Sequence, residues 1–118
     1  MKTLLLVIAF ALSLFADSGN NLVKNNGCMS CHNIMGKKLA PAFMGIARKN
    51  IKWYGNDAKT HIVKSIKNGS QGKYRHFINS SMPSFNYLSD SDCSTLANWI
   101  LQKYEENKGM MKNHKCKD

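Results

Sequence analysis

Two thiols and one imidazole fall within five consecutive residues, the stretch CMSCH at positions 28–32. Three chemistries use such a stretch: a redox-active dithiol, a zinc site, and covalent attachment of a c-type haem. A dithiol of the thioredoxin type lies beside a βαβ pattern, and no strand candidate precedes Cys28. Zinc needs a fourth ligand at a recognisable spacing, and the candidates His114 and Cys116 lie far from any predicted element. Haem accounts for more residues, because two thiols one helical turn apart can reach both vinyl groups at one edge of the macrocycle, and His32 then follows as an iron ligand.

Met82 is the best candidate for a second axial ligand on the other side of such a haem. It lies in the segment SSMPSF, where Pro83 stiffens the backbone that follows it. A thioether opposite a histidine also raises the reduction potential of a haem. His76 is a rival ligand, whereas His61 lies in a predicted helix, where a histidine is more often a surface residue. We expect the other methionines of the predicted domain to be spacers or packing residues: Met29, Met35 and Met44.

The N-terminus has the pattern of a secretory signal peptide at residues 1–16. Lys2 precedes an apolar run at 4–15, which is shorter than the ~20 residues that a membrane-spanning helix needs. Cleavage is expected near Ala16 or Ser18, and a retained membrane anchor is the alternative. The pattern predicts an exported protein that resides in the periplasm.

The chain that remains is short, basic and rich in lysine. Its 102 residues suffice for one small domain with a thin core, which a large apolar cofactor would help to fold. Its 16 basic and 7 acidic side chains give a net charge of +9, and only Arg48 and Arg75 are arginines. Because nucleic-acid readers rely on arginine, we expect no nucleic-acid partner. A lysine coat favours an acidic protein surface or, as a weak association, an anionic membrane surface.

The hydrophobic pattern predicts an all-α fold without a clear strand. Residues 20–31 are expected to form a short helix that carries the two motif cysteines. Residues 58–68 form a second helix, with Asp57 as its N-cap and Gly69 at its end. The apolar positions of this second helix recur with helical spacing: Ala58, Ile62 and Ile66.

The last predicted helix begins after Ser89 and extends to residue 104. Ser89 and Asp92 have the spacing of a capping box, and Leu88 and Cys93 have that of a hydrophobic staple. One apolar stripe follows along this helix: Leu96, Ala97, Ile100, Leu101 and Tyr104.

Long loops are predicted at 33–56 and 69–88, and loops of that length in a small domain usually surround a bound group. The last residues, from 105 on, are polar and without period. The predicted layout is therefore the signal peptide, one domain at 17–104 and a basic flexible tail at 105–118.

Two further cysteines lie outside the CMSCH motif. Cys93 is expected to pack as a small hydrophobic residue. The 23-residue separation between it and Cys116 permits a disulfide. We favour a free or intermolecular Cys116, because the helix and the tail diverge.

Five segments, in this order, resemble the small bacterial class I c-type cytochromes. They are CMSCHNIMGKKLAPAF, WYGNDA, IKNGSQGKY, MPSF and LANWILQKY, and the resemblance spans about residues 19–104. It implies a class I cytochrome c fold, with three to five helices wrapped around one covalently attached haem c and its iron. It also implies that Cys28 and Cys31 form the thioethers and that His32 and Met82 are the axial ligands.

Three more residues receive roles from the resemblance. The loop at Pro41 would supply the carbonyl that accepts the other ring N–H of the ligand histidine. Trp53 would lie near a haem propionate, and Trp99 would pack near the first helix around Gly27. A plain turn or core position is the alternative for each, and for Trp99 a core position is preferred. Ala40 departs from the family pattern, in which glycine usually precedes the proline.

The predicted function is that of a monomeric, periplasmic electron carrier without enzymatic activity. The resemblance implies one-electron transfer from a donor such as a cytochrome bc complex to a terminal oxidase or a peroxidase. Acidic docking surfaces on these proteins would meet lysines around the haem edge: Lys37, Lys38, Lys49 and Lys73. The alternative is a haem enzyme or gas sensor, which requires a displaceable sixth ligand in place of a restrained Met82.

Overall fold

The structure, a computed structural model, describes residues 18–111. The predicted signal peptide at 1–16 and the candidates His114 and Cys116 lie outside the described residues. In chain order the elements are a helical segment at 18–25, a 3₁₀ turn at Cys28–Ser30, α2 (Phe43–Tyr54), a 3₁₀ turn at Gly55–Asp57, α3 (Ala58–Asn68), β1 (Ser70–Gln71), a 3₁₀ turn at Arg75–Phe77, β2 (Ser81–Met82) and α4 (Asp90–Met111). Helices dominate this order, which confirms the predicted all-α class.

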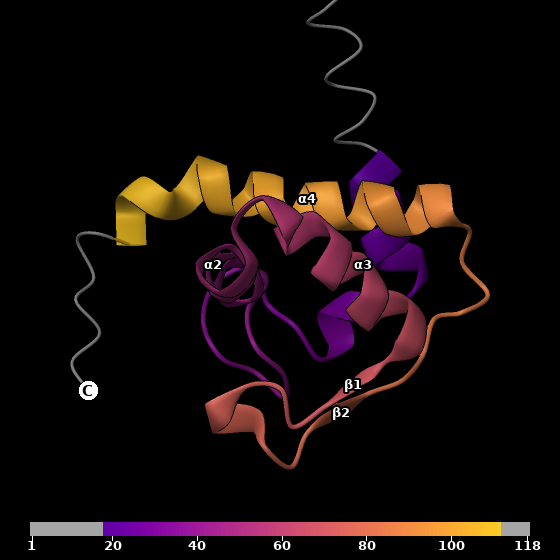
Figure 1. The fold of residues 1–118 in the computed structure, drawn as a ribbon, viewed down its shortest axis with the longest axis horizontal. Coiled ribbons are helices and arrows are strands. Elements are labelled where there is room, and N and C mark those ends of the chain that lie inside the picture. The colour runs from indigo at the N-terminus through magenta and orange to yellow at the C-terminus, as the bar shows by residue number, and fades with distance from the viewer. Residues whose placement is uncertain (1–17, 112–118) are drawn as a thin grey trace, which may run out of the picture.

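The three long helices pack on one another in pairs. Figure 1 shows α4 along one side of the molecule, with α2 and α3 beneath it and the two short strands at the opposite end. Apolar side chains from the helical segment at 18–25 and from all three helices meet in one core: Val23, Phe43, Ala47, Ile62, Ile66, Cys93, Leu96, Ala97, Trp99 and Ile100.

The start of α4 agrees with its sequence signals. The backbone N–H of Asp92 donates to the hydroxyl oxygen of Ser89 at 3.0 Å, as an N-cap requires. Leu88 packs against the core that contains Cys93, and the Cys93 side chain is fully buried. The predicted capping position and the predicted burial of Cys93 are both confirmed.

The end of α4 differs from the prediction, because the helix continues through residues 105–111. The expectation of an irregular tail is wrong for this stretch. Lys103 pairs with Glu106 at 3.3 Å, and Lys108 pairs with Glu105. Opposite charges at this spacing lie on neighbouring turns of a helix and favour its continuation. Charge pairs and good helix formers thus extend α4 beyond the point where its apolar stripe ends.

The predicted loop at 33–56 contains a helix, α2, that the sequence signals did not reveal. Its N-cap is Ala42, which makes no side-chain hydrogen bond, and Gly45 interrupts its first turns. The N–H of Phe43 instead donates to the backbone carbonyl of Asn33 at 2.9 Å. The start of α2 is therefore stabilised by the segment that follows the CMSCH motif, a tertiary contact that no local pattern predicts.

The segments around the motif and around Met82 are more regular than expected. The first helix ends at residue 25 rather than 31, and Gly27 has a φ of 66°, which favours glycine. β1 and β2 form an antiparallel pair in which Ser70 faces Met82 and Gln71 faces Ser81. The predicted loop at 69–88 thus contains two short strands that fix Met82 next to the end of α3.

Candidate functional site

A cavity of about 440 Å³ lies within the fold and brings together the four residues predicted to bind the cofactor. Cys28, Cys31, His32 and Met82 all line it. Its volume is within the range of about 300–1,000 Å³ that cofactor pockets occupy. Apolar side chains from distant parts of the chain complete much of the wall: Val23, Phe43, Ile46, Ile62, Ile66, Phe85, Leu96 and Ile100.

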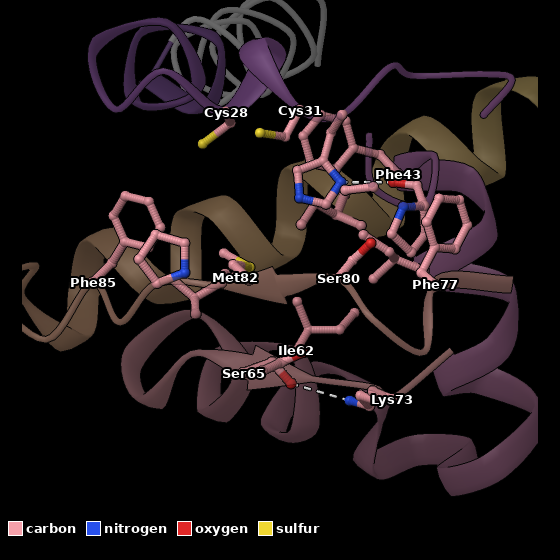
Figure 2. Close-up of a pocket in the computed structure, with 18 of the residues that line it drawn as sticks. Cys28, Cys31, Phe43, Ile62, Ser65, Lys73, Phe77, Ser80, Met82 and Phe85 are labelled. Carbon is pink, nitrogen blue, oxygen red and sulfur yellow. Dashed lines mark hydrogen bonds between the residues drawn. The ribbon is translucent and has the colours of Figure 1, made fainter. Parts of the chain in front are cut away.

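The two motif cysteines lie side by side at one edge of the cavity (Figure 2). Both thiols are free, with Cys28 partly buried and Cys31 exposed. The backbone N–H of Cys31 donates to the Cys28 carbonyl at 3.3 Å, and that of His32 donates to the same oxygen at 3.0 Å. Burial raises the pKa of the Cys28 thiol, and a backbone hydrogen bond offsets part of the effect. This single tight turn places both thiols and the imidazole along the wall of the same cavity.

His32 is 7% exposed and held in a defined tautomer. Its Nδ1 lies 2.6 Å from the carbonyl oxygen of Pro41. Because a carbonyl can only accept, Nδ1 carries the proton and Nε2 has a free lone pair, the arrangement that a metal-bound imidazole uses. Burial lowers the pKa of His32, and the hydrogen bond to Pro41 acts in the opposite direction. The contact with Pro41 that the resemblance implied is present.

The plane of the His32 ring is fixed by a stack of aromatic side chains. Phe43 stacks on His32 with ring centroids 4.9 Å apart, and Trp99 meets Phe43 edge-on at 5.1 Å. Trp99 is 4% exposed, and its indole N–H donates to Asn20 at 2.7 Å. The preferred core position of Trp99 is therefore confirmed, but it packs on the first helix at Asn20 and its neighbour Gly19 rather than around Gly27.

Met82 is half-buried, and its backbone is restrained on both sides. Its strand pairs with Ser70, directly after the end of α3. Three residues later, the N–H of Phe85 donates to the Ile66 carbonyl at 3.0 Å. In Figure 2 the Met82 side chain lies inside the cavity, between Phe85 and Ser80.

Other candidates from the sequence lie away from the cavity. His61 stacks on Tyr54 with ring centroids 3.5 Å apart, and His76 is exposed in a 3₁₀ turn. Neither histidine lines the cavity, and neither does Trp53, which is 43% exposed. Met35 is 42% exposed, so its predicted packing role is wrong, whereas Met44 is 2% exposed, as expected.

A group of polar residues in the wall was not predicted as part of the site. Asn50 is fully buried, and its amide N–H donates to the Ile46 carbonyl at 2.8 Å and to the Tyr74 hydroxyl at 3.1 Å. The Lys73 ammonium donates to the Ser65 hydroxyl at 3.0 Å and to the Asn50 side-chain oxygen at 3.3 Å. The sequence suggested Lys73 only as a docking residue. The separation of 23 positions between Asn50 and Lys73 conceals their contact.

The residues around the cavity fit a covalently attached, largely apolar, iron-containing cofactor. Two free thiols lie at one edge, a neutral imidazole with a free Nε2 lies beside them, and most of the wall is apolar. Within the described part of the chain, no three His, Cys, Asp or Glu side chains cluster as a metal site by themselves. No helix among residues 18–111 is long and apolar enough to cross a membrane. The fold and the cavity together define a small helical haem protein.

Comparisons with known proteins agree with this class. The family model for cytochrome c matches residues 16–103. Cytochrome c-552 of Hydrogenobacter thermophilus is 34% identical over 102 residues, which cover 86% of this chain and 97% of that protein. Cytochrome c-551 of Pseudomonas aeruginosa is 37% identical over 93 residues, which cover 79% and 84%. The crystal structure of wild-type Nitrosomonas europaea cytochrome c552 matches with a TM-score of 0.60 and 36% identity, covering 70% of this chain and 96% of that one.

The chain therefore belongs to the cytochrome c family. It has the class I cytochrome c fold and binds one covalent haem c with its iron. It functions as an electron carrier, and its partners are redox proteins.

Proposed function

We propose that Cys28 and Cys31 hold the haem through thioether bonds and that His32 and Met82 are its two axial ligands. The observation that carries this proposal is that all four side chains line the same cavity. The rival histidines lie elsewhere, which supports the choice of Met82. The bound haem supplies a single one-electron iron couple.

The surrounding residues keep the ligands in place while the charge of the site changes. The Pro41 carbonyl orients the His32 imidazole, and the pairing with Ser70 holds the backbone of Met82. Apolar side chains such as Ile62 and Phe85 exclude water from the cavity. A site that rearranges little between two oxidation states suits electron transfer and needs no acid–base group.

The sixth-ligand position distinguishes a carrier from the alternative, a haem enzyme or gas sensor. A restrained Met82 would block small ligands, so carbon monoxide should leave the spectrum of the reduced holoprotein unchanged over minutes. Met82→Ala should bind carbon monoxide at once, because its position beside the iron is then open. Rapid binding by the unaltered protein would favour the sensor or enzyme instead.

Acidic docking surfaces on a donor such as a cytochrome bc complex, and on an acceptor oxidase or peroxidase, are the partners we propose for a monomeric carrier. Lys37 is exposed, and the Lys38 ammonium lies at the rim of the motif, where it donates to the Met29 carbonyl at 2.8 Å. Lys49 lies over the exposed Trp53 ring at 5.8 Å. Transfer rates should fall as ionic strength rises, and Lys37→Glu should lower them further at low salt. Electron-transfer rates that do not change with ionic strength would contradict this docking mode.

The periplasm is the compartment we propose, since residues 1–16 have the pattern of a signal peptide. N-terminal sequencing of the haem-loaded protein from a periplasmic fraction tests this. A first residue near Asp17 or Gly19 is expected. A protein that retains Met1 in the membrane fraction would contradict cleavage.

A further inference from the structure

The side chain of Lys73 is half-buried rather than free in solvent. It is anchored at 3.0 Å to Ser65 on α3 and at 3.3 Å to the buried Asn50 on α2. All three side chains line the haem cavity. An ammonium has three N–H donors, and these two hydrogen bonds leave one of them for another acceptor.

No acidic side chain of the described residues compensates the charge of Lys73. The cavity wall contains neither Asp nor Glu, and the ion pairs among residues 18–111 use other lysines. A partly buried cation with only neutral partners is costly unless an anion joins it. Burial also lowers the pKa of the Lys73 ammonium, as expected for an uncompensated charge.

The position of this cation matches the chemistry of the haem periphery. The vinyl groups that form thioethers and the two propionate carboxylates lie at opposite edges of the macrocycle. Figure 2 shows Cys28 and Cys31 on one side of the cavity and the hydrogen-bonded pair Ser65–Lys73 on the opposite side. A haem tethered at the cysteines would direct its carboxylates toward Lys73.

We infer that Lys73, held by Ser65 and Asn50, is the counter-ion of a propionate carboxylate of the bound haem. This inference rests on the proposed attachment through Cys28 and Cys31. It replaces the predicted role of Lys73 as a docking residue, because a lysine paired inside the cavity is not free to meet a partner. It also moves the propionate contact from Trp53, which does not line the cavity, to a charged residue that does.

Other titratable groups lie near Lys73, and their effects on the measurement must be distinguished from its own. The rings of Tyr54 and Tyr74 lie 5.9 Å from its Nζ, and His61 stacks on Tyr54. Burial raises the pKa of Tyr74 to about 12, so this group keeps its proton at neutral pH. Histidines change charge between about pH 5 and 8, so each measurement is repeated in His61→Gln.

The test measures the propionates directly in the holoprotein. Cells fed carboxyl-labelled δ-aminolaevulinate produce haem with ¹³C at the propionate carboxyls, and their resonances report each carboxyl's titration. The variants are Lys73→Met, which removes the charge, and Lys73→Arg, which keeps it. Lys64→Met is the matched control, because Lys64 is an exposed lysine on α3 outside the cavity and the net charge changes equally.

In Lys73→Met, one propionate should bind its proton about tenfold more tightly, a rise of about one pH unit. Lys73→Arg and Lys64→Met should retain the unaltered titration. Equal shifts in Lys73→Met and Lys64→Met would overturn the inference. Intact mass is recorded for every variant, so that a failure of haem attachment, which would refute the proposed function, is distinguished from a failure of this contact.

Discussion

A β-carbon placed on Gly69 would lie 2.7 Å from the backbone carbonyl oxygen of Met82. It would also lie 3.1 Å from the backbone nitrogen of Ser84. Gly69 ends α3 with a φ of 76°, a conformation that side chains disfavour. The absence of a side chain at Gly69 therefore lets the Met82 strand lie directly against the end of α3, where the methionine reaches the cavity.

Gly69→Ala should displace Met82 and weaken the bond to the haem iron that we propose for it. Imidazole added to the oxidised holoprotein should replace the thioether about tenfold more readily, corresponding to about 1.4 kcal/mol of strain. The measurement is an optical titration with imidazole. Gly36→Ala is the matched control, because Gly36 has a φ of 82° but no atom within 4 Å of its β-carbon position. Equal imidazole affinities in the two variants would show that Gly69 does not position Met82.

Gly19→Ala should destabilise the contact between the first helix and α4. An added β-carbon would lie 2.5–2.8 Å from three atoms of Trp99, which is buried and packs on Phe43. We expect a loss of about 1–3 kcal/mol in the free energy of unfolding, measured by urea denaturation of the holoprotein. Gly45→Ala, within α2 and without a neighbour inside 4 Å, should instead gain about 0.5–1 kcal/mol. A neutral Gly19→Ala would indicate that the first helix does not pack closely on Trp99.

Tyr74 should make stability fall with rising pH above about 10. Burial raises its pKa to about 12, and the hydrogen bond from Asn50 acts in the opposite direction. An unfolded tyrosine loses its proton near pH 10, so between about 10 and 12 the folded state binds more protons than the unfolded state. The free energy of unfolding should then fall by about 1.4 kcal/mol per pH unit, a contribution fully present below about pH 10 and lost as pH rises through about 12.

Denaturation of Tyr74→Phe across this alkaline range checks the prediction, since the variant should lack that share of the slope. Tyr87→Phe is the control, because the Tyr87 side chain is 67% exposed. If both variants follow the unaltered protein, Tyr74 does not retain its proton in the folded state.

Local signals were sufficient to predict some elements and not others. Ser89 at the start of α4 and the glycine after α3 are caps that act within a few residues of the chain, so the sequence revealed them. α2 begins without a capping side chain and relies on the Asn33 carbonyl. The start of α2 therefore depends on the conformation of the segment that follows CMSCH. Hydrophobic periodicity does not predict such a contact.

The candidate site divides in the same way. The CMSCH spacing predicts a covalent tether, because that chemistry needs thiols close together in the sequence, and the family resemblance implied the contact with Pro41. The hydrogen bonds of Lys73 to Ser65 and Asn50 join α2, α3 and the segment after β1. In the sequence each of these residues is an ordinary polar position. Their contact depends on the packing of the helices, which local patterns do not predict.

Covalent haem with a methionine ligand can be detected by combining an optical spectrum with an intact mass of the mature holoprotein. We expect a mass equal to the mature chain plus one haem, and a far-red charge-transfer band from a methionine–iron bond. The band should disappear in Met82→Ala and persist in Met35→Ala, whose side chain is 42% exposed. A chain without covalent haem, or a band that survives Met82→Ala, would contradict haem attachment with Met82 as the axial ligand.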